Sequence, residues 1–77
     1  MEIEKAFGQT LKELRIKSGL SQEALALECD LDRTYISLLE RGLRQPTLKT
    51  LFKLSGTLEI LPSKFLASLE KLLSSTP

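Results

Sequence analysis

The chain contains no histidine, no tryptophan and a single cysteine among its 77 residues. Without histidine, neither the usual zinc sites nor a histidine-based catalytic site can be built. We therefore expect no metal, no cofactor and no enzymatic activity. Cys29 has no second cysteine to pair with, which fits a reducing cytoplasm. Its short apolar side chain is typical of a small core residue.

Long apolar stretches are also missing. No run approaches the roughly 20 residues that cross a bilayer, and the N-terminus does not resemble a signal peptide. A hydrophobic content of 42% is that of an ordinary globular protein. These observations predict one small domain over residues 1–77 that works in the cytoplasm without membrane contact. Because so short a chain builds a small core, a second subunit is expected to help stabilise it.

The net charge of +1 hides an uneven distribution. Residues 1–32 carry four basic and seven acidic side chains, which gives −3. Residues 33–53 carry five basic side chains against Glu40 alone, which gives +4. Residues 54–77 balance at zero. A local positive segment of this kind indicates a binding site for an anionic partner, although the net charge of the whole chain gives no such indication.

Hydrophobic periodicity and capping residues predict five helices and no strands, an all-α fold. Gly19 suits the end of the first helix, Asp30-Leu31 the turn after the second, and Gly42 the end of the third. Gly56 or Thr57 is expected to close the fourth helix, and Pro62 to open the fifth. The expected helices cover residues 3–18, 22–29, 33–41, 48 to 56 or 57, and 62–73, with a frayed tail at 74–77.

Each expected helix has an apolar face that would point towards the core. In the first helix it comprises Ile3, Phe7, Leu11 and Leu14, and in the second Leu25, Ala26 and Cys29. The fourth helix presents Leu48, Leu51, Phe52 and Ser55. The broad stripe of the fifth helix comprises Phe65, Leu66, Leu69, Leu72 and Leu73.

Residues 21–41 read as two short helices joined by a tight turn. On the second of them Arg33, Thr34, Ser37 and Arg41 share an arc of about 100°, whereas Ile36 and Leu39 point the other way. A short helix that packs by its back and offers guanidinium and hydroxyl groups in front suits the DNA major groove.

These residues match a known pattern: Gly-Leu-Ser-Gln-Glu-Ala-Leu-Ala at 19–26, Leu-Asp-Arg-Thr-Tyr-Ile-Ser at 31–37 and Glu-Arg-Gly at 40–42. The sequence resembles the lambda-repressor-like, Xre-type helix-turn-helix domain over about residues 5–66, with the helix-turn-helix at about 21–41. Its Asp-Arg-Thr-Tyr-Ile-Ser string resembles the controller proteins of restriction–modification systems. The resemblance implies a five-helix homodimer that binds double-stranded DNA at a palindromic operator and regulates transcription without a small-molecule effector. A phage-type repressor, or an antitoxin that also binds a protein, is the alternative.

The resemblance also implies a set of DNA contacts. Gln22, at the start of the second helix, is expected to meet a phosphate, and Arg33 to read a guanine or to clamp a phosphate. Tyr35 either packs or reaches a phosphate, and Leu38 either touches a thymine methyl group or covers Leu43. The full expected set is Gln22, Arg33, Thr34, Tyr35, Ser37, Leu38, Arg41, Arg44, Thr47 and Lys49.

Three further expectations concern the scaffold and its partners. Arg15 and Glu40 match a family ion pair that joins the first helix to the end of the third. Acidic residues of the second helix (Glu23, Glu28, Asp30) either face RNA polymerase or are simply solvated. The dimerisation helix is expected at about 62–73, although its residues can instead be buried within one chain. The expected interface is Leu58, Ile60, Leu61, Phe65, Leu66, Leu69 and Leu72.

Overall fold

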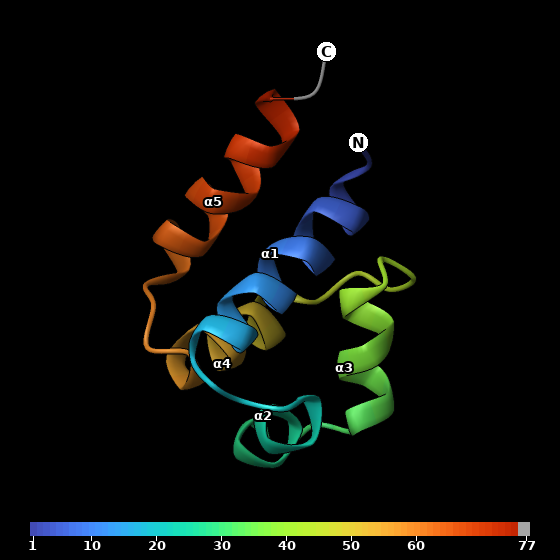
Figure 1. The fold of residues 1–77 in the computed structure, drawn as a ribbon, viewed down its shortest axis with the longest axis vertical. Coiled ribbons are helices and arrows are strands. Elements are labelled where there is room, and N and C mark those ends of the chain that lie inside the picture. The colour runs from blue at the N-terminus through green and yellow to red at the C-terminus, as the bar shows by residue number, and fades with distance from the viewer. Residues whose placement is uncertain (76–77) are drawn as a thin grey trace.

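The computed structural model describes residues 1–75, and within that range the chain forms five helices and no strand. This arrangement of five helices confirms the all-α prediction (Figure 1). Thr76 and Pro77, half of the expected tail, lie outside the described residues, whereas Ser74 belongs to the last helix. The helices are α1 (Ile3–Lys17), α2 (Gln22–Cys29), α3 (Arg33–Glu40), α4 (Leu48–Thr57) and α5 (Pro62–Ser74).

Side-chain caps begin the three middle helices where the sequence predicts them. The Ser21 hydroxyl accepts from the Ala24 N–H, the Asp32 carboxylate from the Thr34 N–H, and the Thr47 hydroxyl from the Thr50 N–H. Each bond satisfies a backbone donor that has no partner inside its own helix. The starts of α2, α3 and α4 are therefore encoded locally.

A left-handed residue follows each of the first four helices. Gly19 and Gly42 have φ of 77° and 74°, and each is followed by the backbone bond of a Schellman motif, from Leu20 to Arg15 and from Leu43 to Leu38. The fourth helix runs through Gly56 and ends at Thr57, which is one of the two ends that the sequence predicts. Its reversal falls at Glu59, whose φ is 56°.

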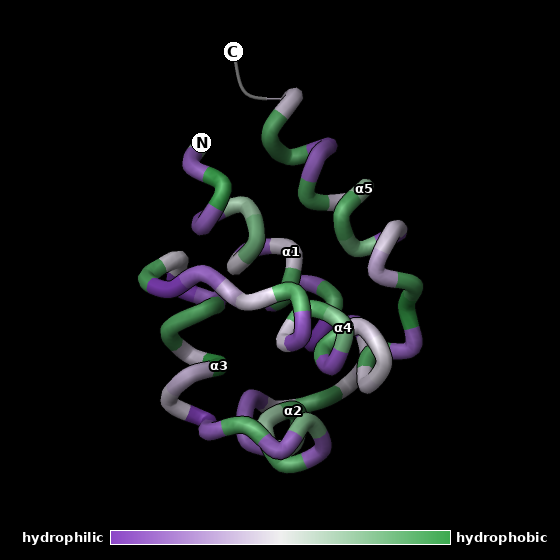
Figure 2. The backbone as a smooth tube through the Cα atoms, turned by 180° about the vertical axis from the view of Figure 1, so that it is seen from behind, coloured by the Kyte–Doolittle hydropathy of each residue, from purple (hydrophilic) through white to green (hydrophobic). Residues whose placement is uncertain are grey.

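All five helices contribute to the hydrophobic core, with α1 in contact with α3 and with α5. The rings of Phe7 and Phe65 stack at a centroid distance of 5.0 Å and join α1 to α5. Hydrophobic and hydrophilic stretches alternate along the helices (Figure 2), as amphipathic packing requires. Cys29 is buried as expected, with its sulfur 3.2 Å from the Thr57 hydroxyl.

Several predicted core positions are wrong. Ile3, Leu48 and Phe52 are 56%, 74% and 61% exposed. In α4 the buried side is formed by Thr50, Leu51, Leu54 and Ser55, so Leu48 and Phe52 lie outside it. The apolar stripe of α4 is wider than the core needs, and periodicity alone does not show which edge of a stripe is buried.

No described helix is long and apolar enough to cross a membrane.

Candidate nucleic-acid interface

The turn between α2 and α3 fixes the angle of the two helices. Asp30 adopts the left-handed conformation at φ 55°, and the Leu31 N–H donates to the Ala26 carbonyl at 2.8 Å. Leu31 is half-buried against the core. The turn is thus held both by a backbone bond and by its own side chain, which gives α3 a defined exit from α2.

The third helix has a buried side and an open side. Ile36 and Leu39 are 0% exposed. Arg33 and Thr34 are exposed, and Ser37 is half-buried. Tyr35 and Leu38 are also half-buried, at the border between the two sides, whereas Arg41 is exposed just after the helix ends. The open side of α3 therefore offers one guanidinium and two hydroxyl groups to solvent while its back is fixed.

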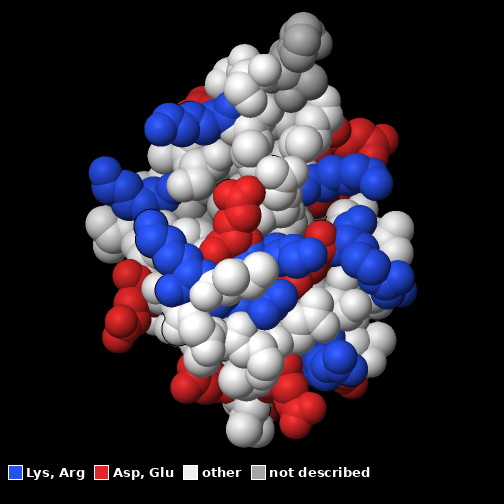
Figure 3. Space-filling view, viewed as in Figure 1, with Lys and Arg blue, Asp and Glu red and all other residues white. Residues whose placement is uncertain are grey.

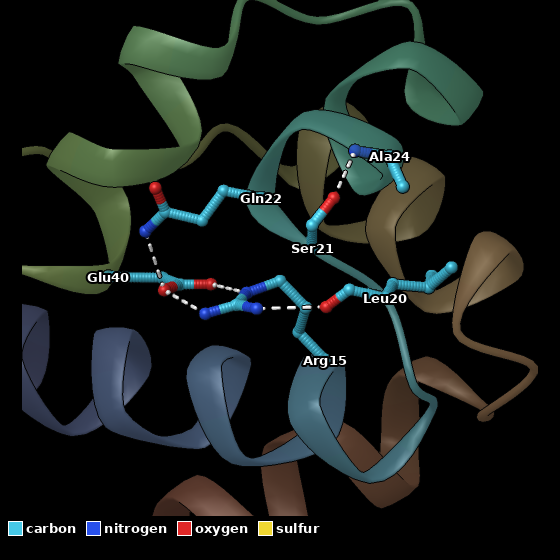
Figure 4. A network of polar contacts seen from close by, with 6 residues as sticks. All are labelled: Arg15, Leu20, Ser21, Gln22, Ala24 and Glu40. Atoms are coloured by element: carbon cyan, nitrogen blue, oxygen red, sulfur yellow. Dashed lines mark hydrogen bonds and ion pairs between the residues drawn. The ribbon is translucent and has the colours of Figure 1, made fainter.

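An ion pair holds the C-terminal end of α3 to α1 (Figure 4). Arg15 donates to both carboxylate oxygens of Glu40, at 2.6 Å from Nε and 3.0 Å from Nη2, and its Nη1 donates to the Leu20 carbonyl at 2.8 Å. The two side chains are only 11% and 3% exposed. The hydrogen bond to Glu40 raises the pKa of Arg15. The structure thus confirms this pair as a structural contact.

Gln22 joins the same cluster, which the sequence does not reveal. Its Nε2 donates to Glu40 Oε1 at 3.0 Å, so Gln22 is tied to the end of α3 from the start of α2 (Figure 4). An amide nitrogen carries two hydrogens, and one of them remains for a further acceptor. The bond to Glu40 limits the orientations of this side chain at the N-terminus of α2, where anions are favoured.

Two surface hollows bring the expected contact residues together. One is lined by Gln22 and Arg33 with part of α2, and the other by Thr34, Tyr35 and Leu38 with Arg44 from the loop after α3. Sequence reasoning missed Gln45, which lines the second hollow. Its Nε2 donates to Glu4 Oε2 at 2.7 Å and ties the loop to α1. The pKa of Glu4 is lowered by a hydrogen bond to its own backbone and by the one from Gln45.

The other expected contact residues are also exposed and follow α3 in the sequence. Arg41 comes directly after α3, and Thr47 and Lys49 lie at the start of α4. Figure 3 shows basic and acidic side chains interspersed over one face of the molecule, so no sign dominates that whole face. A polyanion would be bound through local groups of cations and not through overall charge.

The expected dimer residues divide into two groups. Leu58, Phe65 and Leu69 are 7%, 0% and 6% exposed within one chain, so they belong to its own core and offer almost no surface to a partner. This corrects the prediction for those three residues. Leu61 and Leu66 are 64% and 46% exposed. Ile60 and Leu72 are half-buried.

An apolar groove of about 260 Å³ lies between the N-terminal ends of α1 and α4 and the side of α5. Its exposed walls are Ile3, Leu48 and Leu66, and its floor is formed by buried Phe7, Leu51 and Leu69. The groove collects most of the side chains that the sequence wrongly places in the core. Exposed apolar residues gathered at one place mark an interaction surface more often than scattered ones do.

The chain belongs to the helix-turn-helix family, whose model matches residues 11–65. Within that family it is similar to the control proteins of restriction–modification systems. It is 49% identical over 61 residues to control protein C.BamHI of Bacillus amyloliquefaciens, covering 78% of this chain and 75% of that protein.

Two solved structures are similar as well. The controller protein C.AhdI of Aeromonas hydrophila superposes with a TM-score of 0.78 at 45% identity, covering 80% of this chain and 94% of that one. The controller protein C.Esp1396I, a tetramer bound to its natural 35 base-pair operator, gives 0.83 at 35% identity, covering 92% of this chain and 93% of that one.

Proposed function

We propose that this helix-turn-helix regulator binds a palindromic operator as a homodimer and controls transcription in a bacterial restriction–modification system, in the cytoplasm. The observation that carries the proposal is the two-sided α3, with a completely buried back and a front of guanidinium and hydroxyl groups. Its similarity to a controller protein bound to operator DNA supports it. In a dimer, two such helices enter successive major grooves about one helical turn apart.

The side chains take different parts in binding. Arg33 reads a guanine through its O6 and N7 atoms, Thr34 and Ser37 bond base edges or phosphates, and Leu38 meets a thymine methyl group. Phosphate contacts set the register of the protein on the duplex but carry no sequence information. Those contacts come from Gln22, Tyr35, Arg41, Arg44, Thr47 and Lys49.

Replacing Arg33 by alanine tests the base-reading role. We expect operator affinity to fall by about 10–100-fold, the equivalent of one bidentate base contact, with relaxed preference at one base pair of each half-site. Affinity for a panel of single-base operator variants is the measurement. Lys12→Ala, an exposed cation on α1, is the control. An Arg33→Ala protein with an unchanged preference at every position would contradict the role.

The apolar groove and the exposed leucines beside it form the dimer interface in this proposal. Leu48 and Leu66 both line the groove, and Phe52 lies one turn beyond Leu48 on α4. Leu61 adds an exposed side chain just before α5. Burying these surfaces against a second copy removes apolar area that one chain leaves in water.

Replacing Leu66 by glutamate should shift the protein towards monomer, because two carboxylates would be buried in the symmetric interface. Sedimentation equilibrium measures the shift. Ile16→Glu places the same charge on a leucine-sized exposed site, 58% exposed and away from the groove, and should leave the dimer intact. If Leu66→Glu sediments as the wild-type dimer does, the interface lies elsewhere.

The outer side of α2 supports contact with RNA polymerase. Leu27 is 82% exposed and lies between Glu23 and Glu28, both exposed. A leucine flanked by carboxylates fits a basic protein surface with an apolar centre.

We expect Leu27→Ala to reduce activated transcription in a purified system several-fold while operator affinity stays within about twofold, because a truncated exposed leucine affects only the surface that meets a partner. Glu13→Ala, exposed on α1, is the control. Unchanged transcription by Leu27→Ala would exclude this contact.

A further inference from the structure

Gly8 lies where α1 crosses the last turn of α3. A Cβ atom at this position would lie 2.4 Å from the Leu39 carbonyl oxygen, 2.5 Å from the Glu40 carbonyl oxygen and 2.8 Å from the Glu40 carbonyl carbon. All three are backbone atoms of α3. The two helices therefore approach more closely at Gly8 than any residue with a side chain permits.

The backbone conformation of Gly8 does not itself require glycine. Gly8 is helical, and the glycines with positive φ are Gly19 and Gly42. Gly56, a second helical glycine, has no neighbour within 4 Å of an added Cβ. At Gly8 the missing side chain makes room for the backbone of α3, and at Gly56 it makes room for nothing.

We infer that Gly8 is a positioning residue for the recognition helix, setting the distance of the C-terminal end of α3 from α1. The inference rests on the proposed function, because it concerns where α3 presents Arg33 and Ser37 to a base pair. Gly8 and Arg15 lie about two turns apart on α1, and both contact the end of α3, one by close approach and one by the ion pair with Glu40. Together they fix this end of α3 at two points.

An added methyl group would displace that end. A carbon and a carbonyl oxygen come no closer than about 3.3 Å without repulsion, so a gap of 2.4 Å must widen by about 1 Å. The hydrogen bonds that Arg15 donates to Glu40 oppose a shift of the whole helix, so α3 tilts. Designed binding sites lose function beyond about 0.5 Å of misplacement. Contacts from flexible side chains to phosphates tolerate such a tilt better than bidentate base contacts do.

The experiment compares Gly8→Ala with Gly56→Ala, the same chemical change where there is room. Each protein is titrated with the upstream duplex that the wild-type protein protects from nuclease, and separately with poly(dI–dC). We expect Gly8→Ala to lose about 10–100-fold in affinity for the protected duplex and at most about threefold for poly(dI–dC), so that the ratio of the two affinities falls. Gly56→Ala should keep the wild-type ratio. Circular dichroism and sedimentation confirm that both variants are folded and equally dimeric.

The outcomes separate the inference from the proposed function. If the wild-type protein shows no preference for any upstream duplex, the proposed function fails. If it does and Gly8→Ala keeps the wild-type ratio, or loses both affinities equally, the inference is overturned. Should Gly8→Ala not fold at 25 °C, the titrations are run at 4 °C. A variant that stays unfolded there also overturns the inference, since Gly8 would then be a requirement of the core.

Discussion

Replacing Glu40 by alanine should lower the free energy of unfolding by about 3–5 kcal/mol, because it leaves the Arg15 guanidinium buried without its counter-charge. Arg15 would retain only the Leu20 carbonyl, and Gln22 would lose its acceptor. A domain of this size has a total stability of about 4–12 kcal/mol. The melting temperature should therefore fall on the order of 20 °C, which thermal unfolding followed by circular dichroism measures at fixed protein concentration.

Two variants make this result specific to the ion pair. Glu13→Ala removes an exposed carboxylate of α1 whose partner is the neighbouring Gln9, and should change stability by no more than about 0.5 kcal/mol. Glu40→Gln keeps an acceptor for Arg15 but not the charge, and should fall between the two. A Glu40→Ala protein as stable as Glu13→Ala would show that the pair contributes nothing to the fold.

DNA binding should be strongly weakened by salt. Arg41, Arg44 and Lys49 supply three cations per chain for phosphates, hence six in a dimer, and Arg33 adds to them. Binding that neutralises about 6–10 phosphates loses about 10³–10⁵ in affinity between 50 and 200 mM salt. Fluorescence anisotropy of a labelled upstream duplex, titrated at several salt concentrations, gives the slope of log affinity against log salt.

Matched lysine variants identify the cations that contribute to the slope of log affinity against log salt. Lys49→Ala should reduce it by about two per dimer, because each chain then neutralises one phosphate fewer. Lys12→Ala, exposed on α1, should leave it unchanged. Affinity that does not vary with salt would instead favour a protein as the main partner, the alternative that an antitoxin represents.

Local signals account for most of the fold. Ser21, Asp32 and Thr47 cap helices because their side-chain oxygens reach backbone donors two or three residues away. Gly19 and Gly42 end helices because only a left-handed residue completes the final turn there. The sequence left Gly56 and Thr57 as alternative ends of α4. Because glycine is tolerated inside a helix, α4 continues to Thr57, and the left-handed position falls at Glu59.

What the sequence did not reveal depends on contacts between distant residues. Phe65 and Leu66 are neighbours in the same apolar stripe, yet one stacks on Phe7 and the other faces the groove. The hydrogen bonds from Gln22 to Glu40 and from Gln45 to Glu4 join residues 18 and 41 positions apart, so no local sequence pattern predicts them. The closeness of α1 and α3 likewise becomes visible only when both backbones are placed.

The most direct test is an electrophoretic mobility shift at low ionic strength with duplexes that tile the DNA upstream of the gene. Because a dimer presents the two-sided α3 twice, we predict one retarded complex at nanomolar to tens-of-nanomolar protein concentration. This complex should form only with duplexes that contain a single palindromic site. Absence of a shift with every upstream duplex would contradict the account.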